Sequence, residues 1–188
     1  MGAGQSQVKN WVQKFDTAPL DQLFRGVIDL DNGNTATSRL LTLQRYSIEN
    51  YLLDPFVIFG LLVENGTAPA IKDVSISAGD EHLIRNLPET LLQLILDTVR
   101  SNVESCLDDL EAKQKQSEKV EFTNGKTVQY PNWMLSYRGH DLLPVYQSLF
   151  GGAKVISPPR LKKVLQRVRL IPKDLALLMK KLQNADNN

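Results

Sequence analysis

Apolar residues recur along this chain at two spacings, one typical of helices and one typical of strands. The longest helical pattern runs from about Leu87 to Gln116, where apolar or small positions fall three or four residues apart. The stripe consists of Leu91, Leu94, Ile95, Thr98, Val99, Val103, Cys106, Leu107 and Leu110. It predicts an amphipathic helix whose apolar side faces either the core or a partner surface, such as a second copy in a homodimer.

Shorter stretches with helical spacing lie on both sides of this long helix. Ser47 precedes one of them and is the expected N-cap, and Asn65-Gly66 is expected to end another. The residues between Thr67 and Asn86 have a mixed pattern and predict a loop. The predicted short helices cover residues 8–15, 47–54, 55–64, 138–150, 160–170 and 172–183.

Strand patterns are short and fall in two places. The apolar run at Val27, Ile28 and Leu30 is bounded by helix breakers, as in a buried strand of a parallel sheet. A second strand is expected within RLLTLQRYS, residues 39–47. Residues 119–131 alternate on both sides of Asn124-Gly125, the favoured pair for a two-residue hairpin turn. The pattern predicts an α/β beginning and a mostly helical remainder with one hairpin near residues 119–130.

Composition indicates an ordinary globular protein, with 42% hydrophobic residues, 23% charged residues and a net charge of +1. Cys106 is the single cysteine, so an intrachain disulfide is excluded, and its helical context predicts a partly buried side chain. No run approaches the roughly 20 apolar residues of a membrane span, and no secretory signal is recognisable. We therefore expect a cytoplasmic protein that does not bind membranes.

Charge is unevenly distributed, because residues 154–181 carry nine Lys or Arg and one acid, Asp174. A basic cluster of this kind can follow a nucleic-acid backbone, and it can equally be a solvated helix face. The residues expected to bind nucleic acid are Arg160, Lys162, Lys163, Arg167 and Arg169. Three aromatic residues, Tyr130, Trp133 and Tyr137, would either stack bases or pack in the core.

The stretch GVIDLDNGN places Asp29 and Asp31 one residue apart at the end of an apolar run. Side chains alternate along a strand, so both carboxylates lie on the same side. Carboxylates that close repel one another unless a cation lies between them, and Mg²⁺ prefers oxygen ligands. The alternative is a strand end followed by an Asn-Gly turn.

Glu49 stands in RYSIENYLL between apolar neighbours, where a charge needs a reason. One interpretation is an acid in the first turn of a helix, favoured by the helix dipole. The other is that this acid belongs to the same site as the Asp pair.

The order of these motifs resembles a known family. VIDLDN followed by QRYSIENYLLDP resembles the Toprim-type domains that occur with OLD-family ATPases and in related anti-phage systems. RGHDLLPVYQSLF is similar to that family's helix start with a glycine and a basic residue, and LIPKDLALLMKKL to its terminal helix. The resemblance extends from about Gly4 to Leu182, and D-x-D followed by ENYLL is its most specific part. It implies a partial Toprim-like, Rossmannoid parallel sheet in residues 1–66 and a helical extension in residues 67–188.

The resemblance also implies a site and a reaction. Asp29, Asp31 and Glu49 would bind Mg²⁺ or Mn²⁺, and Glu49 would also orient water. Arg138 and His140 would be catalytic, although the family usually has Lys at the position of His140. Because His is mostly neutral at pH 7, it would stabilise a phosphate less than Lys does. The implied activity is phosphodiester cleavage of DNA or RNA in a defence system, together with a partner or fused ATPase.

One part of the family pattern is missing. A Toprim fold opens with a strand that carries a catalytic Glu, whereas the acids before Asp29 are Asp16 and Asp21, and neither ends an apolar run. We therefore expect a fragment of a longer protein, a chain that receives the strand from a partner, or a decayed copy. The alternative function is a non-catalytic module that binds a partner or nucleic acid.

Other classes of protein lack their motifs here. No G-x-x-x-x-G-K-[ST] is present, as a P-loop ATPase would require. A zinc site is disfavoured by one Cys and two separated His residues, His82 and His140. No G-x-S-x-G supports a serine hydrolase.

Overall fold

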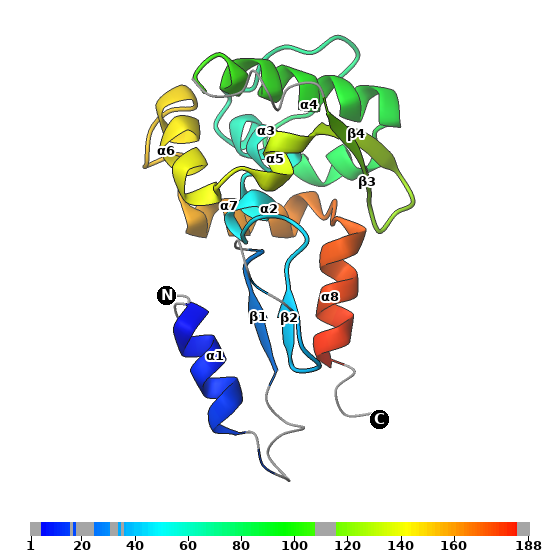
Figure 1. The fold of residues 1–188 in the computed structure, drawn as a ribbon. Coiled ribbons are helices and arrows are strands. Elements are labelled where there is room, and N and C mark those ends of the chain that lie inside the picture. Colours follow the sequence, from blue (N-terminus) through cyan, green and yellow to red (C-terminus); the bar gives the residue numbers. More distant parts are fainter. Residues whose placement is uncertain are drawn as a thin grey trace.

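The computed structural model describes residues 5–15, 17, 25–30, 34, 36–107 and 116–183. Figure 1 shows a helical body above a narrower part that contains two strands and the helices near both ends of the chain. The elements are α1 (Gln5–Lys14), β1 (Gly26–Ile28), β2 (Leu40–Thr42), α2 (Glu49–Leu52), α3 (Pro55–Glu64), η2 (Glu81–Asn86), α4 (Glu89–Glu104), β3 (Ser117–Glu121), β4 (Thr127–Pro131), α5 (Asn132–Ser136), α6 (Gly139–Leu149), α7 (Pro158–Val168) and α8 (Lys173–Gln183).

The narrower part is a three-layer arrangement of helix, sheet and helix. Strands β1 and β2 are parallel, as the apolar run predicted, with Gly26 opposite Leu40. Helix α1 packs on one face of the pair through Val12, which clusters with Ile28 and Leu40. Helix α8 packs on the opposite face, where Leu175 and Leu178 meet Leu43 and Val27. Figure 1 shows the two helices on opposite sides of the strands.

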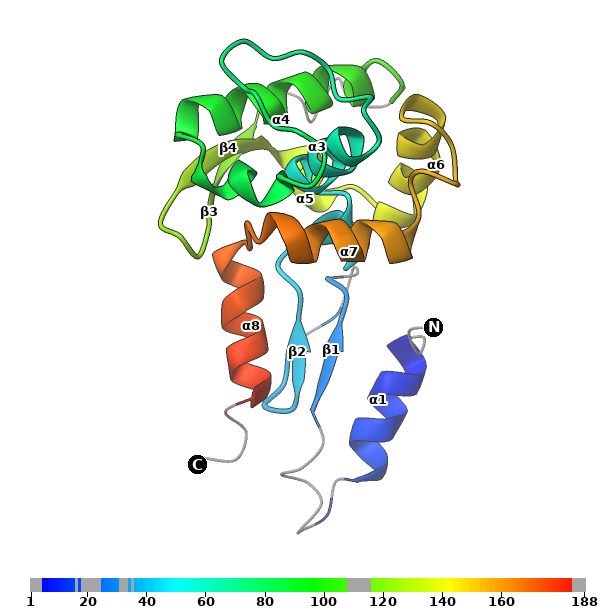
Figure 2. The ribbon, with the colours of Figure 1, turned by 180° about the vertical axis from the view of Figure 1, so that it is seen from behind.

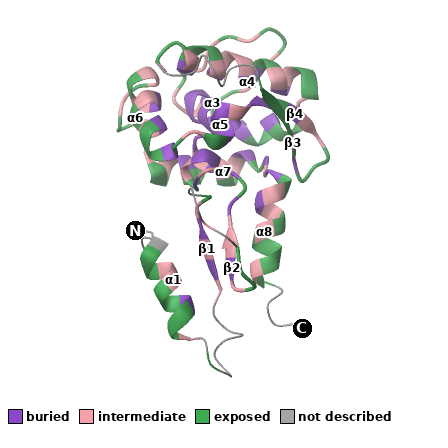
Figure 3. Cartoon of the chain, in the orientation of Figure 1, coloured by how far each residue is buried: buried purple, intermediate pink, exposed green. Residues whose placement is uncertain are grey.

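The helical body is built around α3, which is apolar on every side and buried from Pro55 to Val63. Close packing with α7 requires Gly60, because a Cβ there would lie 2.8 Å from Val168 Cγ2. The resemblance placed α3 in the first of two parts, residues 1–66. In the structure, the side chains of α3 share one core with α4 and α7, which belong to the second part. Figure 3 shows this buried core, in purple, concentrated in the helical body.

The predicted hairpin is confirmed as the antiparallel pair β3 and β4. Gly125 has φ of 82°, the left-handed conformation that an Asn-Gly turn places on its glycine. Two of the three candidate base-stacking residues, Tyr130 and Trp133, are fully buried core residues. Because both side chains are buried, they pack in the core and are not available to stack on bases.

The long helix differs from its prediction. Within the described residues α4 ends at Glu104, and Leu110 lies outside them. Cys106 is exposed rather than partly buried, because it follows the last helical turn. Leu94 is 45% exposed, while Leu92 and Leu96 are completely buried. Ile95, Val99 and Val103 are buried as expected, and the buried stripe continues through Leu92 and Leu96 rather than through Leu91 and Leu94.

Two further expectations were wrong. Ser47 does not cap α2, since the N-cap is Ile48 and receives no side-chain hydrogen bond. The stretch expected to be a loop contains the 3₁₀ helix η2. The short helix α5, for which no pattern was noted, follows the hairpin directly.

Among the described residues, no helix has the length and apolar character needed to cross a bilayer.

Candidate functional site

Three segments that are distant in sequence lie side by side where β1 ends. The amide of Leu30 donates to the carbonyl of Tyr46 at 3.0 Å, and the amide of Tyr46 donates to the carbonyl of Leu135 at 2.8 Å. These bonds join the end of β1 to the link between β2 and α2, and that link to α5. Most of the acidic and basic residues predicted as catalytic lie on or next to these segments.

Asp29 follows β1 directly and reaches the start of α2. Its Oδ1 accepts a hydrogen bond from the backbone amide of Ile48 at 3.3 Å. The carboxylate is thereby held beside the residue that precedes Glu49. Asp31, the second acid of the predicted pair, lies outside the described residues.

Glu49 is the first residue of α2 and is half-buried. Gly139, the first residue of α6, lies against it so closely that a Cβ on Gly139 would be 2.7 Å from Glu49 Cβ and 2.5 Å from Ser47 Oγ. Only glycine permits this approach. Arg138 and His140 flank the contact and are exposed, and Arg138 lies 3.8 Å from Asp141 in an exposed ion pair.

The structure thus brings Asp29, Glu49 and the 138–140 segment to one place. Glu49 and the 138–140 segment share the neighbour Asn50, a residue that the motif analysis did not single out. Asn50 Oδ1 accepts hydrogen bonds from the amide and the hydroxyl of Ser47, at 3.1 and 2.9 Å. Its Nδ2 donates to the carbonyls of Met134 and Tyr137, at 3.1 and 3.0 Å. A polar residue inside the apolar stretch IENYLL was the signal available in the sequence.

A buried charged cluster supports this region from inside the helical body. Arg45 Nη1 donates to Asp54 Oδ2 and to the carbonyl of Asn50, both at 2.9 Å. The hydroxyl of Tyr130 donates to the same Asp54 oxygen at 2.9 Å, and Arg45 stacks over the ring of Tyr51 at 4.6 Å. Asp54 also caps α3 by accepting from the amide of Phe56.

The electrostatics of the cluster keep Arg45 charged and its tyrosines neutral. Burial is the largest single influence on Arg45 and disfavours its charge, but the charge and hydrogen bond of Asp54, together with Tyr130 and Asp174, outweigh it, and the net pKa of Arg45 is raised. Burial and then the negative charge of Asp54 raise the pKa of Tyr130 well above its usual value. Arg45 and Asp54 both lie inside QRYSIENYLLDP, but the motif analysis gave neither of them a role, because their pairing with each other and with Tyr130 depends on the fold.

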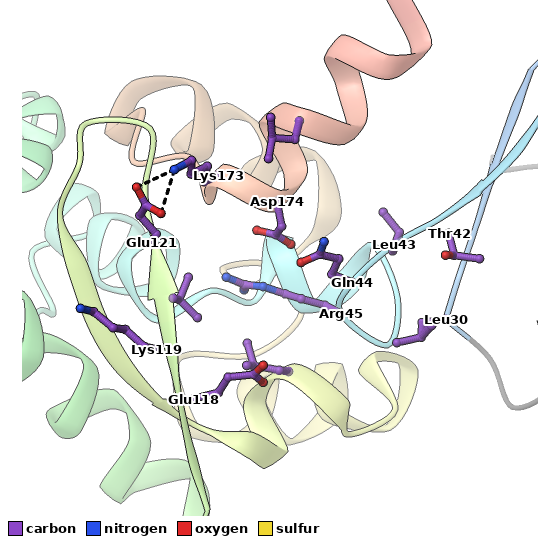
Figure 4. Close-up of a pocket in the computed structure, with 13 residues that line it drawn as sticks. Leu30, Thr42, Leu43, Gln44, Arg45, Glu118, Lys119, Glu121, Lys173 and Asp174 are labelled. Carbon is purple, nitrogen blue, oxygen red and sulfur yellow. Dashed lines mark hydrogen bonds and ion pairs between the residues drawn. The ribbon is translucent and has the colours of Figure 1, made fainter. Parts of the chain in front are cut away.

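A pocket of about 620 Å³ borders the link between β2 and α2. Figure 4 shows the Arg45 side chain crossing it toward β3, with the ion pair of Lys173 and Glu121 at the rim. In that pair Lys173 Nζ lies 2.8 and 2.9 Å from the two Glu121 carboxylate oxygens, and Asp174 accepts a hydrogen bond from the hydroxyl of Tyr51. Both acids are therefore engaged within the protein.

The carboxylates of Asp29 and Glu49 are the oxygen donors that the described part of the site offers a metal ion. Mg²⁺ typically binds one or two protein carboxylates and completes its shell with water and phosphate oxygens. The two residues fit that donor set. Among the described residues, no group of three acidic, His or Cys side chains is close enough to hold a metal by itself.

The five residues predicted to bind nucleic acid fall into two sets. Arg160 and Arg167 are turned toward α3, where both lie within ion-pair distance of Glu64, at 4.0 and 3.3 Å. Arg167 also lies 3.8 Å from the fully buried Glu81 of η2. Lys162, Lys163 and Arg169 are exposed. Figure 2 shows α7 lying between the helical body and the two parallel strands.

Comparisons with protein-family models, with curated proteins and with solved structures gave no match to this chain.

Proposed function

We propose that this chain is the Toprim-like part of a metal-dependent nuclease that cleaves phosphodiester bonds in DNA or RNA. The observation that carries the proposal is the convergence of Asp29, Glu49 and residues 138–140 at the end of β1. In parallel sheets of α/β proteins, ligands bind at this end of the strands. A defence system of the OLD type, with a partner or fused ATPase, is the proposed context.

Each residue has a chemical part in this proposal. Asp29 and Glu49, together with Asp31 two residues after Asp29, bind Mg²⁺ or Mn²⁺. Such an ion, when bound, activates water and stabilises the charge that develops on the phosphate. The Arg138 guanidinium donates to a non-bridging phosphate oxygen. His140, which is exposed, protonates the leaving oxygen, a general-acid role that imidazole side chains commonly take.

The exposed basic residues of α7 extend the proposed substrate surface. Lys162, Lys163 and Arg169 are charges that a nucleic-acid backbone can approach, since their side chains are exposed. Arg160 and Arg167 contribute indirectly in this proposal, because they fix α7 to α3.

The test is Mn²⁺ binding measured by calorimetry on the whole chain, followed by cleavage of labelled single- and double-stranded DNA and RNA. Asp29→Asn and Glu49→Gln are expected to weaken Mn²⁺ binding and to abolish metal-dependent cleavage. Glu118→Gln, on exposed β3, is the matched control and should match the wild type. Mn²⁺ binding that is equal in wild type and both site variants would refute the proposed metal site. A chain that binds nucleic acid without metal or cleavage would instead be a binding module.

A further inference from the structure

Asn50 is 98% removed from solvent by the fold, since only 2% of its surface is exposed. Its amide makes four hydrogen bonds, two as acceptor with Ser47 and two as donor. A side-chain amide has two N–H donors and one oxygen with two lone pairs, so its hydrogen-bonding capacity is filled. A buried amide satisfied in this way has one orientation.

The two donated bonds span a long sequence distance. Their acceptors, Met134 O and Tyr137 O, lie 84 and 87 residues along the chain from Asn50. Tyr137 directly precedes Arg138, Gly139 and His140. Asn50 in turn directly follows Glu49, so one side chain joins the backbone of two proposed catalytic segments.

The backbone of Asn50 is held from the opposite side as well. Its carbonyl accepts a hydrogen bond from Arg45, which the ion pair with Asp54 holds in place. Because α2 is only four residues long and has no side-chain cap, its own hydrogen bonds provide little rigidity. The position of Glu49 therefore depends on contacts with other parts of the chain.

We propose that Asn50 is a positioning residue, which holds Glu49 against the Arg138–Gly139–His140 segment in the geometry that the reaction needs. The inference rests on the proposed function for its effect on catalysis. Its structural part, the tie between α2 and the segment that begins α6, stands on the hydrogen bonds alone.

Asn50→Asp is the most specific variant. It retains the size and an acceptor oxygen, but an ionised Asp cannot donate, so the carbonyls of Met134 and Tyr137 lose their buried partner. Asn50→Ser is the second variant, which keeps a donor too short to span both carbonyls and introduces no charge. The matched control is Asn65→Ser at the end of α3, where Nδ2 donates to Leu61 O at 2.7 Å and Oδ1 accepts from Arg160.

The experiment combines three measurements on the folded whole chain, well below each variant's Tm. These are hydrogen exchange of the amides in residues 49–53 and 138–142, the Mn²⁺ affinity, and kcat and KM for cleavage. We expect both Asn50 variants to exchange faster in these two segments and to lose kcat on the order of tenfold or more. We expect Asn65→Ser to lower Tm without changing exchange in these segments, Mn²⁺ affinity or kcat.

The outcomes separate the two proposals. Faster exchange in both segments, in a chain that neither binds Mn²⁺ nor cleaves, supports the tie and refutes the proposed function. Unchanged exchange and unchanged kcat in folded Asn50→Ser would overturn the positioning role, whatever the activity of the wild type. Should Asn50→Asp fail to fold, Asn50→Ser alone decides.

Discussion

Arg45 and Asp54 form an ion pair at 2.9 Å in which both side chains are almost completely buried, at 3% and 4% exposure. The pair joins the link between β2 and α2 to the start of α3. The hydroxyl of Tyr130 donates a second hydrogen bond to the same Asp54 oxygen. One carboxylate therefore connects the hairpin, the helical core and the segment that carries Glu49.

Asp54→Ala should destabilise the protein strongly, because it leaves the Arg45 charge buried without a partner and removes the cap of α3. We expect a loss of about 3–5 kcal/mol in the free energy of unfolding, measured with urea. Glu121→Ala breaks the exposed pair with Lys173 and should cost roughly 1 kcal/mol or less. Equal losses for the two variants would contradict the structural role of the buried pair.

Stability should fall at alkaline pH because three tyrosines are protected from ionisation. Burial is the main cause that raises the pKa of Tyr51, Tyr130 and Tyr146 in the folded chain. An unfolded tyrosine loses its proton near pH 10, so the folded state binds more protons above that value. The stabilising contribution is thus complete below about pH 10 and declines as the pH rises further, by about 1.4 kcal/mol per pH unit for each protected tyrosine.

Urea titrations between pH 8 and 11, with tyrosinate absorbance as a second signal, measure this decline. Tyr146→Phe removes one protected tyrosine, so the free energy of unfolding should decline less steeply with pH, by about 1.4 kcal/mol per pH unit. A slope that is the same in Tyr146→Phe and the wild type would show that Tyr146 ionises normally in the folded chain.

Gly139→Ala should weaken the contact between α2 and α6, because the new Cβ would lie 2.5 Å from Ser47 Oγ and 2.7 Å from Glu49 Cβ. Overpacking of this kind costs about 1–3 kcal/mol, which thermal or urea unfolding can measure. Adding Ser47→Ala removes the nearest clashing atom and should recover part of the loss. A double-mutant cycle without coupling would mean that the two residues do not touch.

Arg169 ends α7 in a left-handed conformation with φ of 52°, where glycine is favoured. Arg169→Gly should therefore raise the free energy of unfolding by about 1 kcal/mol, the order of the cost that a left-handed backbone imposes on a residue with a Cβ. The same change should weaken nucleic-acid binding and reduce its salt dependence by about one charge, if α7 contacts phosphates. Affinities measured at several salt concentrations, beside urea unfolding, test both effects.

Arg167→Gln is the matched comparison on the same helix. It should lower stability, since it removes the cation closest to the buried Glu81, and leave the salt dependence unchanged. If Arg167→Gln reduced the salt dependence of binding and Arg169→Gly did not, Arg167 would be the phosphate contact and the roles assigned to the two residues would be wrong.

Local patterns determined a large part of the architecture. The short run at Val27 and Ile28 indicated a buried parallel strand, and Asn124-Gly125 specified the hairpin turn. The uniformly apolar stretch from Pro55 to Val63 indicated a buried helix. These features depend on hydrophobic period and turn chemistry within a few residues, so the sequence alone carries them.

The tertiary structure decided which side chains meet, and this required contacts that no local pattern records. Asn50 finds its two acceptors more than eighty residues away, and Asp54 meets Tyr130 across 76 residues. The sequence shows Arg160 and Arg167 only as charges in a basic run. In the fold, α7 packs on α3 and both residues gain acidic partners. The helical pattern predicted a partly buried Cys106, whereas it is exposed because α4 ends before it. For the polar residues among these, burial and long-range pairing overrode local propensity, because the free energy of a buried polar group depends on the partner that the fold supplies.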